Sequence, residues 1–510
     1  MGDGPAGGWA VRGWVILFSA LLLTSCAAGP GFQRPASPAQ AAYAPSSLPD
    51  RTGASKLHGG ETQLLIAGRD IPFEWWELFQ SPALTSLIEK AFRANPTLSA
   101  AQAALREAKE LVDAQQGFFY PAVDASYQAE RHKVPGNNYS SSQPGIQQNG
   151  HNLTTNGINQ PLFYTFHTAQ LSVGFVPDAF GANRRQVESL AAQADAERFA
   201  LEATYITLAS NVVAAAIQEA SLRAQIAATQ EIIRAETKSL GILREQFRLG
   251  YAMRIDVAAQ EAALAQIAAT LSPLQKSLEQ TRDLLRSLAG DLPNRETETF
   301  ELEALRLPPE LPLSVPAKII EQRPDVRAAE AQLHAANAEV GIAVAAMLPQ
   351  FSITGAAGGS ADEIPWMFRS GGTFWSAIGN VTQPVFAGGT LLHRERASRA
   401  ALRQAAAQYQ STVISAYQNV ADTLHAALSD ADALAADGEA EEAAKVTYEL
   451  TRRQMETGYV SSLTVLAAET TYQQALLARV QAQATRFGDS VALFQALGGG
   501  WWNRKELAAR

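Results

Sequence analysis

The chain contains one pattern twice, and this internal duplication restricts its fold more than any other feature of its 510 residues. Matching landmarks are Pro96 with Pro324 and Pro121 with Pro349, both at an offset of 228 residues, and Gly250 with Gly458 at an offset of 208. The repeats of solenoid proteins are only about 20–50 residues long. The sequence therefore predicts two copies of one large unit and a pseudo-symmetric architecture. We expect the copies at 73–290 and 323–500, with a linker at 291–322 and a tail at 501–510.

Long stretches without proline show where uninterrupted helices can form. None of the 24 prolines lies between Pro177 and Pro273, and none follows Pro384. Because proline inside a helix costs about 3 kcal/mol, these alanine-rich stretches favour long helices. The expected long helices are 181–249 and 389–457, the returning helices 252–290 and 460–497, and the opening helices about 95–118 and 323–348. An opening helix stacked on a returning helix would match one long helix of roughly 100 Å in a coiled-coil wall.

Each copy also carries two segments in which apolar and polar residues alternate, as in β-strands. These strands are expected at about 120–132, 168–176, 351–359 and 374–382. Such alternation fits a sheet with one face toward lipid and the other toward water, and about 9–11 residues suit a tilted membrane strand. An ordinary antiparallel sheet over a helical core is the alternative that the pattern leaves open. The predicted fold class is mainly α with β.

Four strands per chain have a consequence for assembly. The smallest membrane barrels have about eight strands, and open sheet edges are not tolerated in lipid. If the strands span a membrane, several chains must therefore share one barrel. Three copies would supply twelve strands, whereas two would give a cramped barrel of eight.

The N-terminus has the features of an export signal followed by a lipid-attachment site. Arg12 precedes the apolar run 14–23, which is too short to span a bilayer and suits residues 1–25 as a signal peptide. Leu23-Thr24-Ser25-Cys26 resembles a bacterial lipobox, and Cys26 is the single cysteine of the chain. We expect covalent lipid on Cys26 and no other cofactor; a chance cysteine at a cleavage site is the alternative. Residues 26–72 are expected to form a lipid-anchored, extended linker, because Pro, Ala, Ser and Gly dominate its first part.

Composition and motifs argue against two other classes of protein. The net charge is −9 and no Lys/Arg cluster is present, so the sequence does not favour nucleic acid as a partner. The seven histidines lack the spacing of metal ligands, and neither a nucleophile elbow nor a phosphate-binding loop occurs. We therefore expect that the protein is not an enzyme.

Several short motifs, in this order along the chain, resemble one known family. They are Cys26–Pro35, Trp75-Trp76 with Phe79, Asn95-Pro96, Pro177–Gly181, Arg248–Tyr251, Gln383–Gly389 and Ala496–Trp501. Together they resemble the TolC-like outer-membrane efflux channels (the outer membrane factor family), in their NodT/OprM-type lipoprotein branch. The resemblance covers essentially the whole mature chain. The residue that follows Cys26 is Ala27. In this respect the chain resembles lipoproteins that are sorted to the outer membrane of Gram-negative bacteria.

The resemblance implies a homotrimer with a 12-stranded β-barrel in outer-membrane lipid and a long periplasmic α-helical barrel. It implies a passive exit duct of a tripartite efflux pump. A periplasmic adaptor (membrane fusion protein) and an inner-membrane transporter, often of the resistance–nodulation–division class, would be its partners. Two alternatives remain open: a non-conducting coiled-coil lipoprotein of the envelope, and a channel for type I protein secretion. The sequence does not identify the exported substrate.

The family resemblance also implies roles for the residues at the two helix turns. Adaptor docking would fall to Arg248, Leu249, Gly250, Tyr251, Gly458 and Tyr459, although each Gly-Tyr pair also suits a simple helix end. Candidates for the periplasmic constriction are Asp256, Thr464, Ala467 and Glu469. Relatives carry acidic residues at the positions of Thr464 and Ala467, so we expect weaker cation binding here. Glu469 is a candidate replacement for the missing acids, and Asp256 is either a helix-start acid or part of the closed mouth.

Overall fold

The computed structural model describes residues 27–36, 43–44, 48–134, 147–148, 151–152, 162–313 and 318–504. The chain forms two compact units. Unit 1 comprises residues up to 33 together with 108–194 and 333–405, and unit 2 comprises 34–107, 195–332 and 406–510. The expected signal peptide (1–25) and Cys26 lie outside the described residues. Each unit takes segments from both sequence copies, because the longest helices run from one unit into the other.

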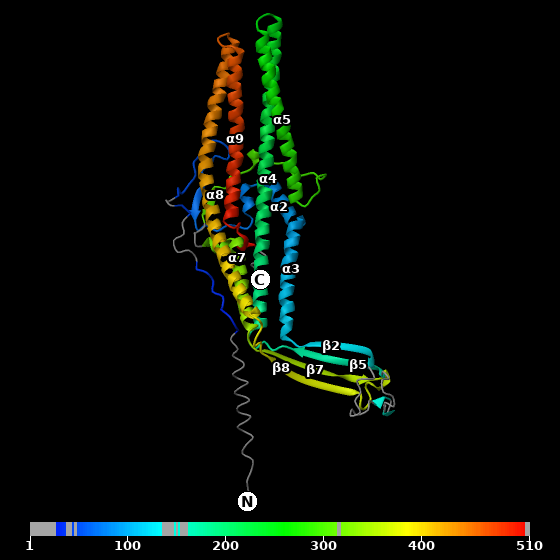
Figure 1. Cartoon of the computed structure of the whole chain (residues 1–510). Coiled ribbons are helices and arrows are strands. Elements are labelled where there is room, and N and C mark those ends of the chain that lie inside the picture. Colours follow the sequence, from blue (N-terminus) through cyan, green and yellow to red (C-terminus); the bar gives the residue numbers. More distant parts are fainter. Residues whose placement is uncertain are drawn as a thin grey trace. The chain divides into compact units, whose positions relative to one another are not determined.

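Unit 1 contains a four-stranded antiparallel sheet in the order β2-β5-β7-β8 (Figure 1). The strands are β2 (Ala122–Val134), β5 (Leu162–Phe175), β7 (Gln350–Ala361) and β8 (Thr373–Thr382). The two sequence copies meet where β5 pairs with β7. β5 begins six residues before the predicted 168, because the aromatic run that opens it hides the alternation. Within the described chain, β2 and β8 each pair on one side only, so the sheet has two open edges.

The pairing register gathers apolar side chains on one face of this sheet. Ala125 pairs with Leu171, Leu171 with Ala357, and Ala357 with Trp375. Trp375 is 80% exposed, and Val123 and Val381 on the same face are also exposed. An exposed, contiguous apolar sheet face is unfavourable in water and is what a lipid-facing sheet requires.

The helices fall into two similar sets. The first set is α3 (Pro96–Gln116), α4 (Ala182–Arg248) and α5 (Arg254–Leu288), and the second is α7 (Pro324–Ala345), α8 (Thr390–Glu456) and α9 (Ser462–Ala496). Both long helices have 67 residues and both returning helices have 35. In unit 2, α4 lies antiparallel to α5, and α8 to α9 (Figure 1). We call these antiparallel pairs the first and second hairpins.

Buried aliphatic side chains hold the first hairpin together. Leu222 and Ile226 of α4 pack against Leu278 of α5, and Leu240 and Leu243 pack against Val257. Burying one such side chain stabilises the fold by about 1.5–3 kcal/mol. α4 also contains an 18-residue window that is apolar enough to cross a membrane, but 61% of that window is buried inside the protein. Its apolar character is therefore accounted for by packing.

Parts of the segment that the sequence predicts as an extended linker, residues 26–72, bond to other elements of their own unit. In unit 1, the Ala28 N–H donates to the Phe180 carbonyl (2.9 Å), and Arg185 donates to the Ala28 carbonyl (3.0 Å). In unit 2, β1 (Leu64–Ala67) pairs in parallel with β6 (Glu310–Leu313), which lies in the predicted linker 291–322. Some residues of both predicted linkers are thus bonded to a helix or paired in the small sheet. Composition missed this because strands of four residues are too short to show alternation.

A cluster of aromatic rings forms the core of unit 2. Trp75 and Phe79 lie on the short helix η1 (Trp75–Phe79), beside the short helix α2 (Pro82–Ala94), and both are fully buried. The Trp75 ring stacks on Phe494 of α9 with centroids 5.2 Å apart. Near the C-terminus, η7 (Trp501–Asn503) packs through Trp501 against Phe199 of α4. The aromatic motifs therefore pack against the C-terminal end of α9 and against the side of α4.

Candidate functional site

The two hairpins end in turns of the same geometry. Gly250 has φ +85° and Gly458 has φ +80°, the left-handed conformation that glycine adopts at helix C-termini. The Tyr251 N–H donates to the Gln246 carbonyl (2.8 Å), and the Tyr459 N–H donates to the Gln454 carbonyl (2.9 Å). The expectation that each Gly-Tyr pair closes a helix therefore holds in the structure, in addition to any role in docking.

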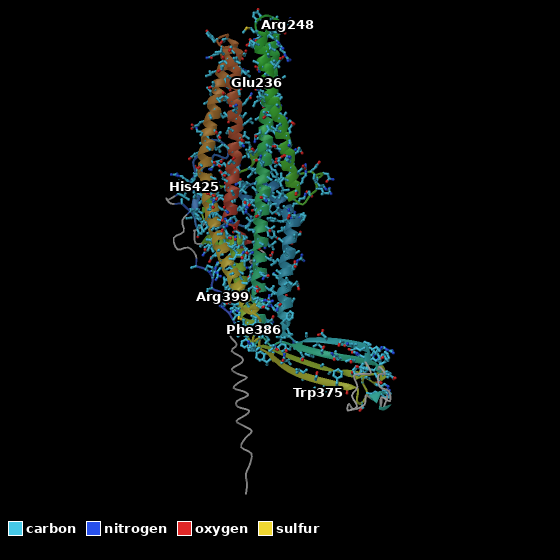
Figure 2. The ribbon with its side chains drawn as sticks, viewed as in Figure 1. Glu236, Arg248, Trp375, Phe386, Arg399 and His425 are labelled. Atoms are coloured by element: carbon cyan, nitrogen blue, oxygen red, sulfur yellow. The ribbon has the colours of Figure 1, made fainter. Side chains whose placement is uncertain are left out.

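These turns expose a set of large apolar side chains, which we call the tip surface. Tyr251 is 84% exposed and Tyr459 is 83% exposed. The other exposed apolar members are Leu249, Met253, Ile255 and Leu463. Arg248, labelled on α4 in Figure 2, pairs with Glu245 through Nη2 and leaves the apolar residues uncovered. Apolar groups presented at a helix turn without covering partners favour contact with another protein.

Asp256 joins the two turns to each other. Its Oδ2 accepts a hydrogen bond from the Met253 N–H (3.1 Å), which caps the start of α5. Its Oδ1 accepts a hydrogen bond from the Ser462 hydroxyl (3.2 Å) at the start of α9. The structure thus shows Asp256 as a helix-start acid that also links the two hairpin ends, whereas a part in a closed mouth stays a prediction.

The other three constriction candidates do not form an acidic surface. Thr464 and Ala467 are exposed and uncharged, and the Thr464 N–H is capped by the Ser461 hydroxyl (3.4 Å). Glu469 is only 5% exposed, so in this structure its carboxyl group cannot replace the missing acids on an exposed ring. Glu469 continues the buried stripe of Val465 and Gln473 at four-residue spacing.

Glu469 instead belongs to a buried polar cluster that sequence reasoning missed. Glu236 of α4 is fully buried and lies within hydrogen-bonding reach of Glu469. The Gln260 side chain of α5 donates to Glu236 Oε2, and the Tyr448 hydroxyl of α8 bonds to Glu469. One signal was available: Glu236 lies four residues from both Ile232 and Leu240, which are buried, so it falls on the apolar face of its helix.

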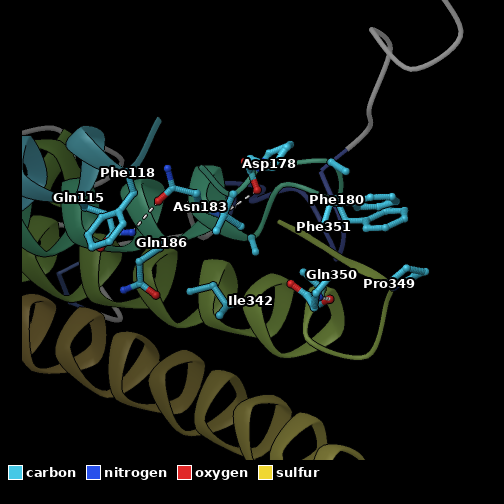
Figure 3. Close-up of a pocket in the computed structure, with 15 residues that line it drawn as sticks. Gln115, Phe118, Asp178, Phe180, Asn183, Gln186, Ile342, Pro349, Gln350 and Phe351 are labelled. Carbon is cyan, nitrogen blue, oxygen red and sulfur yellow. Dashed lines mark hydrogen bonds between the residues drawn. The ribbon is translucent and has the colours of Figure 1, made fainter. Parts of the chain in front are cut away.

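A cavity of about 320 Å³ lies in unit 1 at the start of α4 (Figure 3). Its wall is largely apolar, with Phe118, Phe180 and Phe351 among the lining residues. Several polar groups bond to each other: Gln115 donates to Asn183 Oδ1 (2.6 Å), and the Asn183 N–H donates to Asp178 Oδ1 (2.9 Å). No nucleophile lies beside a general base among these lining residues. The cavity therefore lies where the chain enters α4, and Asp178 caps the start of that helix.

The described residues contain no group of three or more His, Cys, Asp or Glu side chains placed to hold a metal ion. The features that can act on other molecules are therefore the exposed apolar face of the sheet, the tip surface and the buried cluster behind it.

Comparison with known proteins agrees with this geometry. A family model described as "Outer membrane efflux protein" matches the chain twice, at residues 87–291 and 315–499, in line with the duplication. A probable efflux pump outer membrane protein, TtgC of Pseudomonas putida, is 27% identical over 494 residues and covers 95% of each chain. A pyoverdine export outer membrane protein, OpmQ of Pseudomonas putida, is 27% identical over 457 residues, covering 89% of this chain and 94% of its own. The solved outer-membrane channel OprN has a TM-score of 0.79 at 25% identity, covering 93% of this chain and 100% of its own.

Proposed function

Because this chain belongs to the outer membrane efflux protein family, we propose that three copies of it close into one continuous duct that receives its cargo at the tip surface. Its place in the outer membrane and its part in efflux follow from the family. The trimer, the partners and the roles of single residues are our proposal.

The observation that carries the proposal is the four-stranded sheet with two open edges and one apolar face. β2 and β8 have no second neighbour in the described chain, and lipid cannot satisfy the hydrogen-bonding groups along such edges. The β2 edge of one chain paired with the β8 edge of the next removes both defects. Twelve strands from three chains exceed the minimum of about eight that a membrane barrel needs.

The hairpins supply the second half of the duct. Each 67-residue helix is roughly 100 Å long at about 1.5 Å per residue, far more than a small globular core requires. The tip surface at their ends suits a periplasmic adaptor, which would connect the duct to an inner-membrane transporter. The resistance–nodulation–division class is the proposed transporter class. Covalent lipid on Cys26 would add an anchor to the same membrane.

The same observations bear on the two alternative functions, a non-conducting structural lipoprotein and a channel for protein secretion. A non-conducting coiled-coil lipoprotein would not need a sheet with an exposed apolar face. This chain has such a sheet. A protein-secretion channel would share the fold, so the fold does not separate it from small-molecule efflux. TtgC and OpmQ, by their names, serve an efflux pump and pyoverdine export, which favours small cargo. The duct itself would conduct passively and not catalyse a reaction.

One experiment tests conduction and docking separately. Purified wild-type protein in a planar bilayer should give discrete conductance steps. The double variant Tyr251→Ala, Tyr459→Ala should give the same steps, because both side chains are exposed and support no core. In a strain that lacks the chromosomal copy, the double variant should fail to restore efflux, since the adaptor has lost its apolar contacts.

Leu292→Ala is the matched control, because Leu292 is also an exposed apolar residue but lies between the two copies, away from the turns. It should restore efflux fully. Absence of conductance for folded wild-type protein would reject the duct, and full efflux by the double variant would reject docking at the tips.

A further inference from the structure

Two glutamate side chains are buried beside each other in unit 2, on the part of the hairpins that leads to the tip surface. Glu236 lies on α4, twelve positions before Arg248 in sequence, and both are labelled in Figure 2. Glu469 lies on α9 and is 5% exposed in the single chain. Carboxylates are seldom buried without a cation or several donors, so this pair requires an explanation.

The surroundings of the pair are short of donors. Gln260 Nε2 donates to Glu236 Oε2, but Oε1 of Glu236 has no donor among the described residues when both acids are charged. On the other side, the Tyr448 hydroxyl bonds to Glu469, and Arg452 bonds to Tyr448 rather than to either acid. Two charged carboxylates offer only acceptors to each other, whereas one protonated carboxyl group can donate to its neighbour.

We propose that Glu236 and Glu469 share one proton, which fastens α4 of the first hairpin to α9 of the second, and that loss of this proton releases the hairpins from each other. The proposal deepens the duct function and rests on it, because release would widen the mouth at the tip surface. The pair and the groups that face it come from four helices: Glu236 on α4, Gln260 on α5, Tyr448 and Arg452 on α8, and Glu469 on α9.

The raised pKa of Glu469 supports the shared proton. Burial, together with the hydrogen bond and charge of Glu236, raises the pKa of Glu469 from 4.5 to about 9. The folded protein therefore keeps a proton that the unfolded chain releases above pH 4.5. The stability that this proton provides is fully present below about pH 4.5 and is lost as the pH rises to about 9. At neutral pH the proton remains bound, and alkaline conditions remove it.

A second, half-buried acid pair offers a matched control. Asp489 of α9 hydrogen-bonds to Asp430 of α8, and burial together with the Asp430 charge raises the pKa of Asp489 to about 7. Both of these acids belong to the second hairpin. Deprotonation of this pair should change stability, but it cannot release one hairpin from the other.

The test uses purified full-length protein and the variants Glu469→Gln, Glu236→Gln and Asp489→Asn. Glutamine keeps a donor in place of the shared proton and cannot ionise. Between pH 5 and pH 9, the folding constant of the wild type should fall relative to Glu469→Gln by up to ~tenfold per pH unit in urea unfolding. Conductance of the wild type in planar bilayers should rise above pH 9, and conductance of Glu469→Gln should stay constant. Asp489→Asn should alter the stability profile around pH 7 and keep the alkaline rise in conductance.

Glu236→Gln provides the same test from the other side if Glu469→Gln does not fold. Parallel stability profiles for the wild type and the glutamine variants would overturn the proposal. An unchanged alkaline rise in conductance in Glu469→Gln would also overturn it. Stabilisation of the wild type by Ca²⁺ or Mg²⁺, absent in Glu469→Gln, would show a bound metal ion instead of a proton. The unfolding readout requires no conduction, so failure of the proton link is distinct from failure of the duct.

Discussion

Two glycines of the second copy differ in what an added methyl group would meet. Gly458 has φ +80° at the open turn, and a Cβ there would have nothing within 4 Å. Gly498 has φ +92°, and a Cβ there would lie 2.4 Å from the Gln322 carbonyl oxygen. The first position tests backbone conformation alone, and the second also tests close approach of two backbone segments.

We expect Gly458→Ala to lower the free energy of unfolding by about 1–2 kcal/mol, because an L-residue with a Cβ is strained in the left-handed conformation. Gly498→Ala should cost about 1–3 kcal/mol more, because the backbone at Gln322 must move. Thermal unfolding of both purified variants, followed by circular dichroism, measures the difference. Equal midpoints would show that the contact at Gln322 is relieved at no cost.

Single residues also show where sequence reasoning ends. The turns at Gly250 and Gly458 could be predicted, because glycine at a helix end has a local cause in the backbone. The meeting of Glu236 with Glu469 could not, because it depends on how two helices 233 positions apart in sequence face each other. Periodicity places each acid on a buried stripe but does not give its partner.

At the scale of the strand, the two faces of β5 should respond differently to charge. Leu171 shares the apolar face with Ala125 and Ala357, whereas Ser172 points to the opposite face and pairs with Asp124 and Ala356. Leu171→Arg should cost about 2–4 kcal/mol near the bilayer midplane. Ser172→Arg should fold normally and change ion selectivity, since it would add a positive charge to the water-facing side.

Urea unfolding in lipid vesicles measures the cost, and bilayer recordings with salt gradients measure the selectivity. Equal destabilisation by both arginines would contradict a sheet with one face toward lipid.

The elements themselves could be predicted to different degrees. α4 and α8 each begin one residue after the predicted starts at 181 and 389, because proline and glycine bound them in sequence. β1 and β6 were not predicted, since four residues leave no readable period and their parallel pairing joins distant segments. Length therefore separates the elements that a sequence reveals from those that only tertiary contacts define.

For the whole molecule, closure of the barrel predicts a specific cross-link. Cysteines placed on β2 at Asp124 or Ser126 and on β8 at Ser376 or Asn380 should meet only between chains, because these strands are the two edges of one sheet. Oxidised double variants should run as dimers and trimers in denaturing gels without reductant. Variants with one of these cysteines should remain monomeric under the same conditions. A ladder that stops at dimers, or extends past trimers, would contradict a closed ring of three.

The packing of residues 27–30 has a consequence for the order of maturation. The Ala28 N–H is bonded to the Phe180 carbonyl, and a Cβ on Gly181 would lie 2.7 Å from the Ala27 Cα, so Ala27 lies directly against the start of α4. If Cys26 is acylated as proposed, the enzymes that cut the leader and acylate the thiol would act most readily before the neighbouring peptide is bonded to Phe180 and Arg185. In the proposed lipoprotein, export and acylation would therefore precede this last step of folding, and early folding would favour an uncut precursor.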